Sequence, residues 1–197
     1  MPMLAELIPR DRRRGAGIFA RHEGQFLFVG ERTQRAEGEL ACIRVGGGCR
    51  PEESLTDCAR REAREEIGCD VSLPHSYQTF VVDERGGMTA HSLGQTPAPL
   101  LVYTRRRPDE TPPCFHNVVF AASLAAAPRP GPEAETLLLL SEEALLALAR
   151  GPLPLSALQA AGARVDSLRP PPPEAIVFAE PAALHLAALL LRGVQVE

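Results

Sequence analysis

The 197-residue chain contains no lysine and no tryptophan, so all 21 of its basic side chains are arginines. Proteins that bind duplex nucleic acid usually present a broad basic face, whereas this chain has a formal net charge of −4 and no long run of one sign. Its densest basic clusters, residues 12–14 and 105–107, are typical of a solvated edge and less often of a phosphate-binding surface. We therefore expect no nucleic-acid partner.

Cysteine, histidine and serine motifs that commonly carry chemistry are also missing. The five cysteines are odd in number and form no C-x-x-C pair, which argues against a zinc site and against a secreted disulfide framework. The five histidines show no metal-ligand spacing, and no serine lies in a G-x-S-x-G elbow. Reduced thiols fit a cytoplasmic protein.

Long apolar runs are absent as well. The first residues, up to Arg14, contain no apolar signal core. The most apolar stretch, residues 182–191, is about half the length that spans a bilayer and is interrupted by His185. We therefore expect a soluble protein in the cytoplasm, with no membrane partner.

The composition, 45% apolar and 23% charged, is that of an ordinary globular protein. At this length we expect a single domain over residues 1–197, with its core at about residues 14–150. Residues 151–197 are expected to be a proline-rich C-terminal extension, with a stiff spacer at 170–173 and a terminal helix at 182–191. That helix either packs on the core or supports a homodimer.

Short apolar runs separated by turn residues predict a sheet with few helices. Residues 15–20 and 25–29 predict a β-hairpin, and further strands are expected at residues 40–45, 77–82, 100–104, 117–122 and 137–140. Helices are expected at residues 54–67 and 142–150. The glycines 46–48 are expected to break the strand before them, and segments 83–99 and 105–113 to be loops. The predicted fold class is α/β (α+β), a sandwich with a mixed β-sheet.

The helix expected at residues 54–67 carries three glutamates that converge on one side. At roughly 100° per residue, Glu62 and Glu66 fall within the stripe of apolar side chains, and Glu65 falls at its edge. Desolvating three neighbouring carboxylates costs several kcal/mol unless their charge is compensated. The pattern therefore indicates a divalent cation, and magnesium prefers such oxygen ligands. The alternative is a salt-bridged exposed face that uses Arg61 and Arg64.

The spacing around this helix resembles the Nudix box, G-x5-E-x7-R-E-U-x-E-E-x-G-U with U apolar, at every fixed position. The matching residues begin at Gly47 and Glu53, continue through Arg61, Glu62, Glu65 and Glu66, and end at Gly68 and Cys69. Two departures are that Ala63 and Cys69 are small for apolar positions, and that Val45 replaces a proline often found before the glycines. Neither departure touches the chemistry. The resemblance extends over about residues 14–150 and implies an α/β/α sandwich.

The resemblance implies a role for each charged residue of the box. Glu62, Glu65 and Glu66 would bind Mg²⁺, with Mn²⁺ as the other candidate ion, and Glu62 is also a candidate for the base that activates water. Such a metal neutralises charge on diphosphate oxygens and lowers the pKa of bound water. Glu53 would orient the site, and Arg61 would pair with a carboxylate and hold the helix to the preceding loop.

The glycine segment before the helix is the other part of the implied site. The carbonyl of Gly46 would add a metal ligand, and Gly46 and Gly47 allow the backbone to approach metal and phosphate closely. Arg44 and Arg50 flank the glycines, where they either contact phosphate or are solvated. A further catalytic glutamate comes from a loop in some members of the family, and here Glu133 is the preferred candidate, ahead of Glu135.

The resemblance implies a substrate that resembles a nucleoside diphosphate linked to another group. The base of such a substrate could stack on an aromatic side chain, although most of the nine aromatics must also serve the core. The candidates are Phe19, Phe28, Tyr77, Phe80, Tyr103 and Phe115. The sequence lacks the signatures of the family members that cleave ADP-ribose, dinucleoside polyphosphates, coenzyme A or NADH. These signatures therefore do not identify the substrate.

Two other functions are alternatives to a metal-dependent hydrolase. A Nudix-fold sensor would bind a nucleotide with little or no turnover, but such proteins tend to lose box glutamates and this chain retains them. An RNA-end hydrolase would be expected to present a basic surface, which the composition does not provide. The sequence therefore favours a hydrolase acting on a small nucleotide-like diphosphate.

Overall fold

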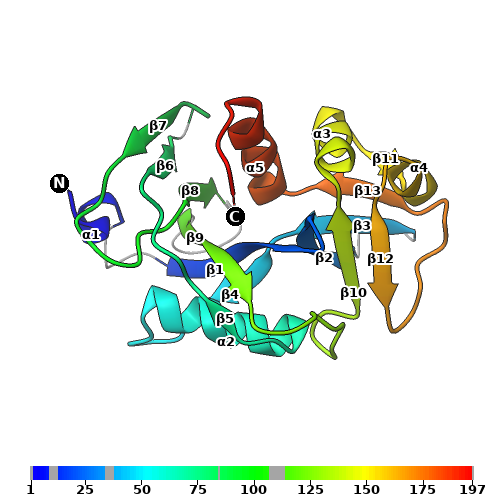
Figure 1. Cartoon of the computed structure of the whole chain (residues 1–197), viewed down its shortest axis with the longest axis horizontal. Coiled ribbons are helices and arrows are strands. Elements are labelled where there is room, and N and C mark those ends of the chain that lie inside the picture. The colour runs from blue at the N-terminus through cyan, green and yellow to red at the C-terminus, as the bar shows by residue number, and fades with distance from the viewer. Residues whose placement is uncertain (1, 9–12, 34–37, 84, 107–113, 197) are drawn as a thin grey trace.

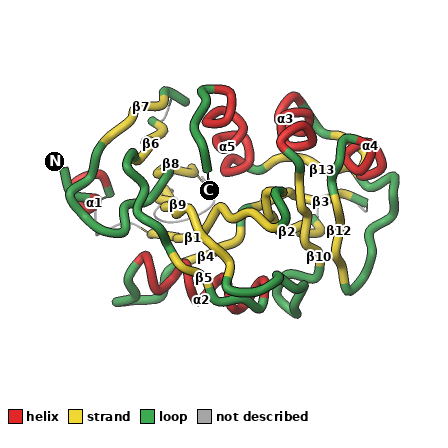
Figure 2. The backbone as a smooth tube through the Cα atoms, in the orientation of Figure 1, coloured by secondary structure: helices red, strands yellow, loops and turns green. Residues whose placement is uncertain are grey.

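A computed structural model describes residues 2–8, 13–33, 38–83, 85–106 and 114–196. A mixed β-sheet lies between two layers of helices, with α2 on one side and α3 and α5 on the other (Figures 1 and 2). The helices are α1 (Leu4–Leu7), α2 (Leu55–Ile67), α3 (Glu142–Arg150), α4 (Leu155–Ala160) and α5 (Pro181–Leu191). This arrangement confirms the predicted α/β sandwich with a mixed sheet.

The predicted hairpin is formed by β1 (Arg13–His22) and β2 (Gln25–Arg32), with His22 opposite Gln25. Only Glu23 and Gly24 form the turn, and both have positive φ angles of 50° and 80°. Such two-residue turns match the right-handed twist of the strands that they connect. The hairpin strands are therefore longer than the apolar runs alone predicted.

Strand β1 lies at the centre of the sheet and positions the rest of it. It pairs in parallel with β9 (Cys114–Leu124) and antiparallel with β4 (Val45–Gly48). On one side of the hairpin, β2 pairs with β3 (Glu39–Ile43) and with β10 (Thr136–Leu140). On the other side, β8 (Leu101–Arg106) pairs with β9 and with β6 (Thr79–Val82). A short strand, β5 (Val71–Ser72), extends from α2 to pair with the end of β9.

The expectation that residues 46–48 break the strand was wrong, because they form most of β4. Gly46 lies opposite Gly17 and Gly47 lies opposite Ala16 in the antiparallel pair. A Cβ atom on Gly46 would lie 2.3 Å from the Cα atom of Gly17, so only glycine allows the two backbones to approach this closely. The glycines therefore bring a strand, and not a loop, next to α2.

The expectation of a loop over residues 83–99 was also incomplete. Residues Met88–His91 form β7, which pairs antiparallel with β6. The strand predicted at residues 77–82 begins only at Thr79. Of the loop predicted at residues 105–113, Arg105 and Arg106 extend β8, and residues 107–113 lie outside the described residues.

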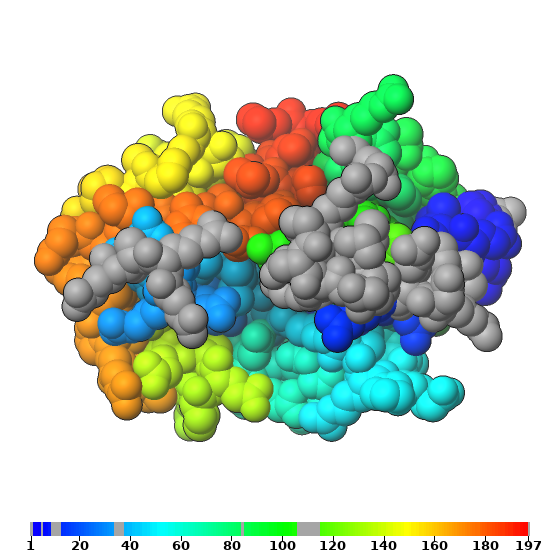
Figure 3. All heavy atoms as spheres, turned by 180° about the vertical axis from the view of Figure 1, so that it is seen from behind, coloured from blue at the N-terminus to red at the C-terminus, as the bar shows by residue number. Residues whose placement is uncertain are grey.

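The C-terminal residues add strands to the sheet, which was not expected of an extension. Strand β12 (Arg164–Ser167) pairs with β10, and β13 (Ile176–Ala179) pairs in parallel with β3 and antiparallel with β11 (Leu153–Pro154). Figure 3 shows these late residues, in orange to red, lying directly beside the strand that follows the hairpin. Residues 151–196 thus complete one half of the sheet.

Two hydrophobic cores lie on opposite faces of the sheet. One contains Phe28, Leu145 and Leu186 and fills the space beneath α3 and α5. The other contains Ile18, Ala63 and Ile67 and fills the space above α2. Burying each large apolar side chain contributes roughly 1.5–3 kcal/mol to stability. The two cores therefore attach the helices on both faces to the sheet. None of the helices in the described ranges is long and apolar enough to cross a membrane.

Candidate active site

The helix α2 carries the acidic side chains, and its ends are fixed by local sequence. The hydroxyl of Ser54 accepts a hydrogen bond from the backbone N–H of Asp57 at 3.0 Å, which caps the first turn. Gly68 ends the helix in a left-handed conformation with φ 60°. The apolar face packs against β1 and β4 through the buried side chains of Ala59, Ala63 and Ile67. This packing fixes which glutamates face the sheet.

Two of the glutamates meet the glycine strand directly. The side chain of Glu62 is buried, and a Cβ atom on Gly47 would lie 2.6 Å from its Oε2 atom. The backbone N–H of Gly46 donates a hydrogen bond to Oε2 of Glu66 at 2.7 Å. The absence of a side chain at residue 47 therefore provides the space that the Glu62 carboxylate occupies.

Arg61 lies at the centre of a network of carboxylates. Its Nε and Nη2 atoms donate to the two oxygens of Glu53 at 2.8 and 3.0 Å. Its Nη1 atom donates to Glu62 Oε1 and to Glu65 Oε2, both at 2.6 Å. Nη2 also donates to the carbonyl of Gly48 at 3.0 Å. One guanidinium therefore links α2, the loop before it and the end of β4.

Burial and charge shift the acidities of these groups in opposite directions. Burial raises the pKa of Glu66 to about 7, although the Gly46 N–H opposes the shift. Burial also raises the pKa of Glu62, against the effect of Arg61. The hydrogen bond from Arg61 lowers the pKa of Glu53 to about 2. Glu53 is therefore held as an anion, whereas the Glu66 carboxylate loses hydration that another cation would have to replace.

The chemical type of the donor atoms suits a hard divalent cation. Glu62, Glu65 and Glu66 lie on one side of α2, but the structure does not bring oxygens of all three within 4.8 Å of one another, and both Glu65 oxygens accept hydrogen bonds from arginines. The strand β4 supplies the carbonyl of Gly46, which accepts a hydrogen bond from Arg44 Nη1 at 3.0 Å. All of these donors are oxygens, as magnesium prefers. The oxygens that already accept from arginine retain a second lone pair. The Glu66 carboxylate, half-buried and held against β4 by the Gly46 N–H, is the observation that favours a cation here.

The two candidate loop glutamates differ in their surroundings. The loop that carries them is tied to α2, because the N–H of Arg129 donates to the carbonyl of Ile67 at 3.0 Å. The charge of Glu133 is close enough to raise the pKa of Glu66. Glu135 instead forms an ion pair with Arg169 at 3.7 Å. The charge of Glu133 thus acts on the box, whereas the ion pair described for Glu135 is with Arg169.

A cleft of about 320 Å³ opens beside the glycine strand. Its walls are formed by β4, by the strands β8 and β9, and by the start of α5; the lining side chains include Arg44, Tyr103, Arg105, Phe115, Asn117 and Glu180. Of the predicted aromatic candidates, only Tyr103 and Phe115 line this cleft. Tyr103 is nevertheless a buried core residue, as are Phe19, Phe28 and Phe80, and Tyr77 is exposed.

The two arginines predicted beside the glycines have different partners. Arg44 is buried, and its Nη2 atom donates to Oδ1 of Asn117 at 2.8 Å in the wall of the cleft. Arg50 is exposed and donates to Glu65 Oε1 at 3.0 Å. Arg44 is therefore placed at the cleft, whereas Arg50 contacts the acidic helix.

Sequence reasoning missed three polar residues of the cleft. Asn117 lies on β9, Glu31 lies on β2, and Glu180 precedes α5 and forms an ion pair with Arg105 at 3.0 Å. Glu180 occupies the N-cap position of α5 but makes no side-chain cap hydrogen bond. No local motif marks these residues, because strands and a helix distant in sequence bring them together.

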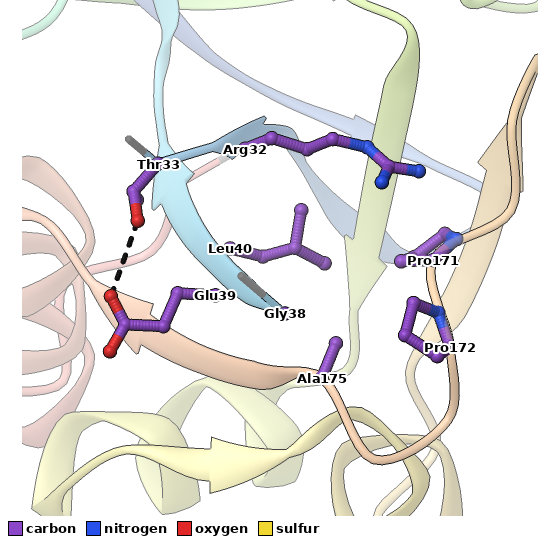
Figure 4. Close-up of a pocket in the computed structure, with 8 residues that line it drawn as sticks. All are labelled: Arg32, Thr33, Gly38, Glu39, Leu40, Pro171, Pro172 and Ala175. Carbon is purple, nitrogen blue, oxygen red and sulfur yellow. Dashed lines mark hydrogen bonds between the residues drawn. The ribbon is translucent and has the colours of Figure 1, made fainter. Parts of the chain in front are cut away.

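A second pocket, of about 160 Å³, lies between the end of β2, the start of β3 and the proline segment (Figure 4). The Thr33 hydroxyl donates to Oε2 of Glu39 at 3.2 Å, and Arg32 Nη2 donates to the carbonyl of Arg169 at 3.0 Å. Pro171 and Pro172 form its opposite wall. Because its polar groups already have partners, this pocket is not assigned a ligand.

The fold and the site together define an α/β/α sandwich in which an acidic helix faces a glycine strand. The sequence model of the NUDIX domain matches residues 11–137, and the chain belongs to the Nudix family. This assignment confirms the resemblance carried by the box.

Three solved structures are similar to this chain, and the first of them, with a TM-score above 0.5, supports the same fold. A NUDIX-family hydrolase from Clostridium perfringens aligns over 94% of this chain and 99% of its own, with 15% identity and a TM-score of 0.54. The Escherichia coli ORF135 protein aligns over 69% of this chain and 78% of its own, with 16% identity and a TM-score of 0.45. A NUDIX hydrolase from Nitrosomonas europaea aligns over 68% of this chain and 60% of its own, with 16% identity and a TM-score of 0.43. A search of curated proteins gave no match.

Proposed function

We propose that this chain is a metal-dependent hydrolase that cleaves a diphosphate bond in a nucleoside diphosphate linked to another moiety. The observation that carries the proposal is the position of the Glu62 and Glu66 carboxylates, which contact the glycine strand at the edge of a cleft. Membership of the Nudix family supports the reaction class. The expected partner is a small molecule and not a nucleic acid.

In this proposal Glu62, Glu65, Glu66 and the Gly46 carbonyl hold Mg²⁺, or Mn²⁺ in its place. The metal, when bound, neutralises charge on the diphosphate and lowers the pKa of a coordinated water. Arg61 is a positioning residue, because its hydrogen bonds fix the Glu62 and Glu65 carboxylates relative to β4. Glu53 in turn fixes Arg61 through two hydrogen bonds.

Glu133 is the proposed base that accepts the proton of the attacking water, with Glu62 and Glu135 as the alternatives. It is exposed, and its charge acts on Glu66 across the loop. Glu135 is less suited because it pairs with Arg169. Replacing Glu133 by Gln should lower kcat more than KM, whereas the matched change Glu135→Gln should leave both nearly unchanged.

The cleft offers recognition for both ends of such a substrate. Phe115, which is partly exposed, provides aromatic surface for a base, which is typical of nucleotide sites. Arg44 places its guanidinium next to Gly46 and Gly47, held there by the Asn117 Oδ1 acceptor, where a diphosphate would reach the metal. The leaving group would extend toward Glu180 at the start of α5.

The test is magnesium-dependent hydrolysis over a panel of substrates, with the Glu65→Gln/Glu66→Gln double variant as the comparison. The panel contains ADP-ribose, dinucleoside polyphosphates, NADH, coenzyme A, nucleotide sugars and nucleoside triphosphates. We expect turnover of one class by the natural chain and loss of that activity by several orders of magnitude in the double variant. Nucleotide binding without turnover, with either magnesium or manganese, would instead identify a Nudix-fold sensor.

A further inference from the structure

Two thiols meet where the glycine strand joins α2, outside the groups used in the proposed reaction. Cys49 follows β4, and Cys58 lies in the first part of α2. The two sulfur atoms and a carboxylate oxygen of Glu53 all lie within 4.8 Å of one another. Cys58 Sγ also lies 3.9 Å from the carbonyl of Gly47 and accepts a hydrogen bond from Arg61 at 3.7 Å.

The two thiols differ in their access to solvent. Cys58 is fully buried, whereas Cys49 is half-buried and lines an open depression of about 450 Å³. Arg13, Arg14 and Arg50 line the same depression. Hydrogen bonding to Cys58 lowers the pKa of Cys49, and the charge of Arg14 acts in the same direction. An accessible thiol in a positive environment is the kind that reacts with oxidants.

The surroundings favour reaction between the thiols over capture of a cation. A cation would need Glu53 as a third ligand, but Glu53 accepts more hydrogen bonds than Glu62 or Glu65, two of them from Arg61 at 2.8 and 3.0 Å. The backbone N–H of Arg50 adds a third hydrogen bond at 2.8 Å. With Glu53 committed to these donors, two neighbouring sulfur atoms remain, one accessible and one buried behind it.

We propose that Cys49 and Cys58 form an oxidation site at which a hydroperoxide produces a disulfide bond between the end of β4 and α2. The Cys49 thiolate attacks the O–O bond, forming a sulfenic acid and releasing water from hydrogen peroxide or an alcohol from an organic hydroperoxide. The Cys58 thiol then attacks the sulfenic sulfur, which gives the disulfide and one water. Two sulfur atoms are oxidised and one peroxide is reduced, and a dithiol reductant reverses the change.

The disulfide would act on the metal site, a consequence that rests on the proposed function. Because an S–S bond is about 2.05 Å long, its formation draws the end of β4 and α2 together. Gly47 already contacts Glu62, and Cys58 already contacts Gly47. Oxidation should therefore displace the Glu62 carboxylate and lower hydrolysis, and reduction should restore it.

The experiment treats the full chain with hydrogen peroxide, blocks the remaining thiols in denaturant, and digests with a protease that cleaves after glutamate. Cleavage at Glu52 or Glu53 separates the two cysteines, so a disulfide keeps two peptides together until a reductant is added. We expect this linked pair, with the buried Cys42 and Cys69 blocked as free thiols. In the Cys58→Ser chain, a 1,3-dione should label a sulfenic acid at Cys49, whereas Cys49→Ser should give no label at Cys58.

Recovery of both Cys49 and Cys58 as blocked free thiols would overturn the proposal, as would pairing of Cys49 with a different cysteine. The peptide measurement on the natural chain needs neither variant to fold. It also needs no turnover, so a linked pair in a chain that hydrolyses nothing would refute the proposed function and leave the oxidation site standing. If hydrolysis is found, it should fall on oxidation in the natural chain but not in Cys49→Ser.

Discussion

At the scale of single residues, the site depends on missing side chains as much as on present ones. Gly47 leaves the space in which the Glu62 carboxylate lies, and Gly46 allows β4 to approach Gly17. Arg61 donates hydrogen bonds to the carboxylates of Glu62 and Glu65 and so fixes their positions. Adding a methyl group at Gly47 therefore tests whether the site depends on the position of the Glu62 carboxylate.

Gly47→Ala should disrupt the site with little effect on folding. The new Cβ would lie 2.6 Å from Glu62 Oε2, and the flexible glutamate would have to move away. Metal affinity and activity should fall by roughly 10–100-fold, as for other changes that misorient ligands. Titration with Mg²⁺ and kcat/KM measurements check this expectation. The matched control is Gly48→Ala, since a Cβ there meets nothing within 4 Å; equal losses in both variants would contradict the explanation.

The common side of the three box glutamates could be predicted because all three lie within one helix. The positions of Glu62, Glu65 and Glu66 follow from helix geometry. Asn117 and Glu180 could not be predicted, because they reach the cleft through pairing of β9 with β1 and of β13 with β3. Register between distant strands leaves no local pattern in the sequence.

At the scale of elements, those with strong local signals were predicted best. The helix α2 has Ser54 at its start and Gly68 at its end, and the structure confirms both. β4 and β7 were not predicted, because glycine and polar residues rarely form strands alone. Each of them is held by a partner strand, β1 and β6 respectively.

Helix α5 offers a test of how firmly the C-terminal elements belong to the core. Leu186 is fully buried in the core beneath α5, whereas Leu184 is 41% exposed. Leu186→Ala should therefore lower the free energy of unfolding by about 2–5 kcal/mol, and the matched Leu184→Ala should change it little. Urea unfolding followed by circular dichroism measures both. If residues 151–196 were an independent appendage, Leu186→Ala would leave the main transition where it is.

At the scale of the whole molecule, the buried carboxylates link stability to pH and to metal. The pKa of Glu66 is raised from its ordinary value of 4.5 to about 7. The folded protein therefore holds a proton there that the unfolded chain releases, and this contribution to stability is lost as pH rises from 4.5 through 7. The pKa of Glu62 is also raised, so this group changes stability with pH in the same direction. A bound cation stabilises the ionised form of the Glu62 and Glu66 carboxyl groups.

Magnesium should consequently stabilise the protein more at pH 8 than at pH 5. At 100 times its Kd, a ligand that binds only the folded state adds about 2.7 kcal/mol, and at pH 5 most of this should be lost because Glu66 is protonated. Thermal unfolding with and without Mg²⁺ at the two pH values measures the difference. Glu66→Gln should remove most of the magnesium effect at pH 8, and an equal effect at both pH values in the natural chain would show that the acidic helix is not the binding site.

The central position of β1 has a consequence for the order in which the chain folds. The middle of this strand, residues 15–20, is apolar and is synthesised early, but its parallel partner β9 pairs Phe115 with Arg13 and Ala122 with Ala20. Until β9 has been made, the described strands that can pair with β1 are β2 and β4. Pairing between segments so far apart closes a long loop and slows folding. During synthesis the protein should therefore pass through a stage that exposes an unpaired apolar strand edge, when it is most prone to aggregate and to engage chaperones.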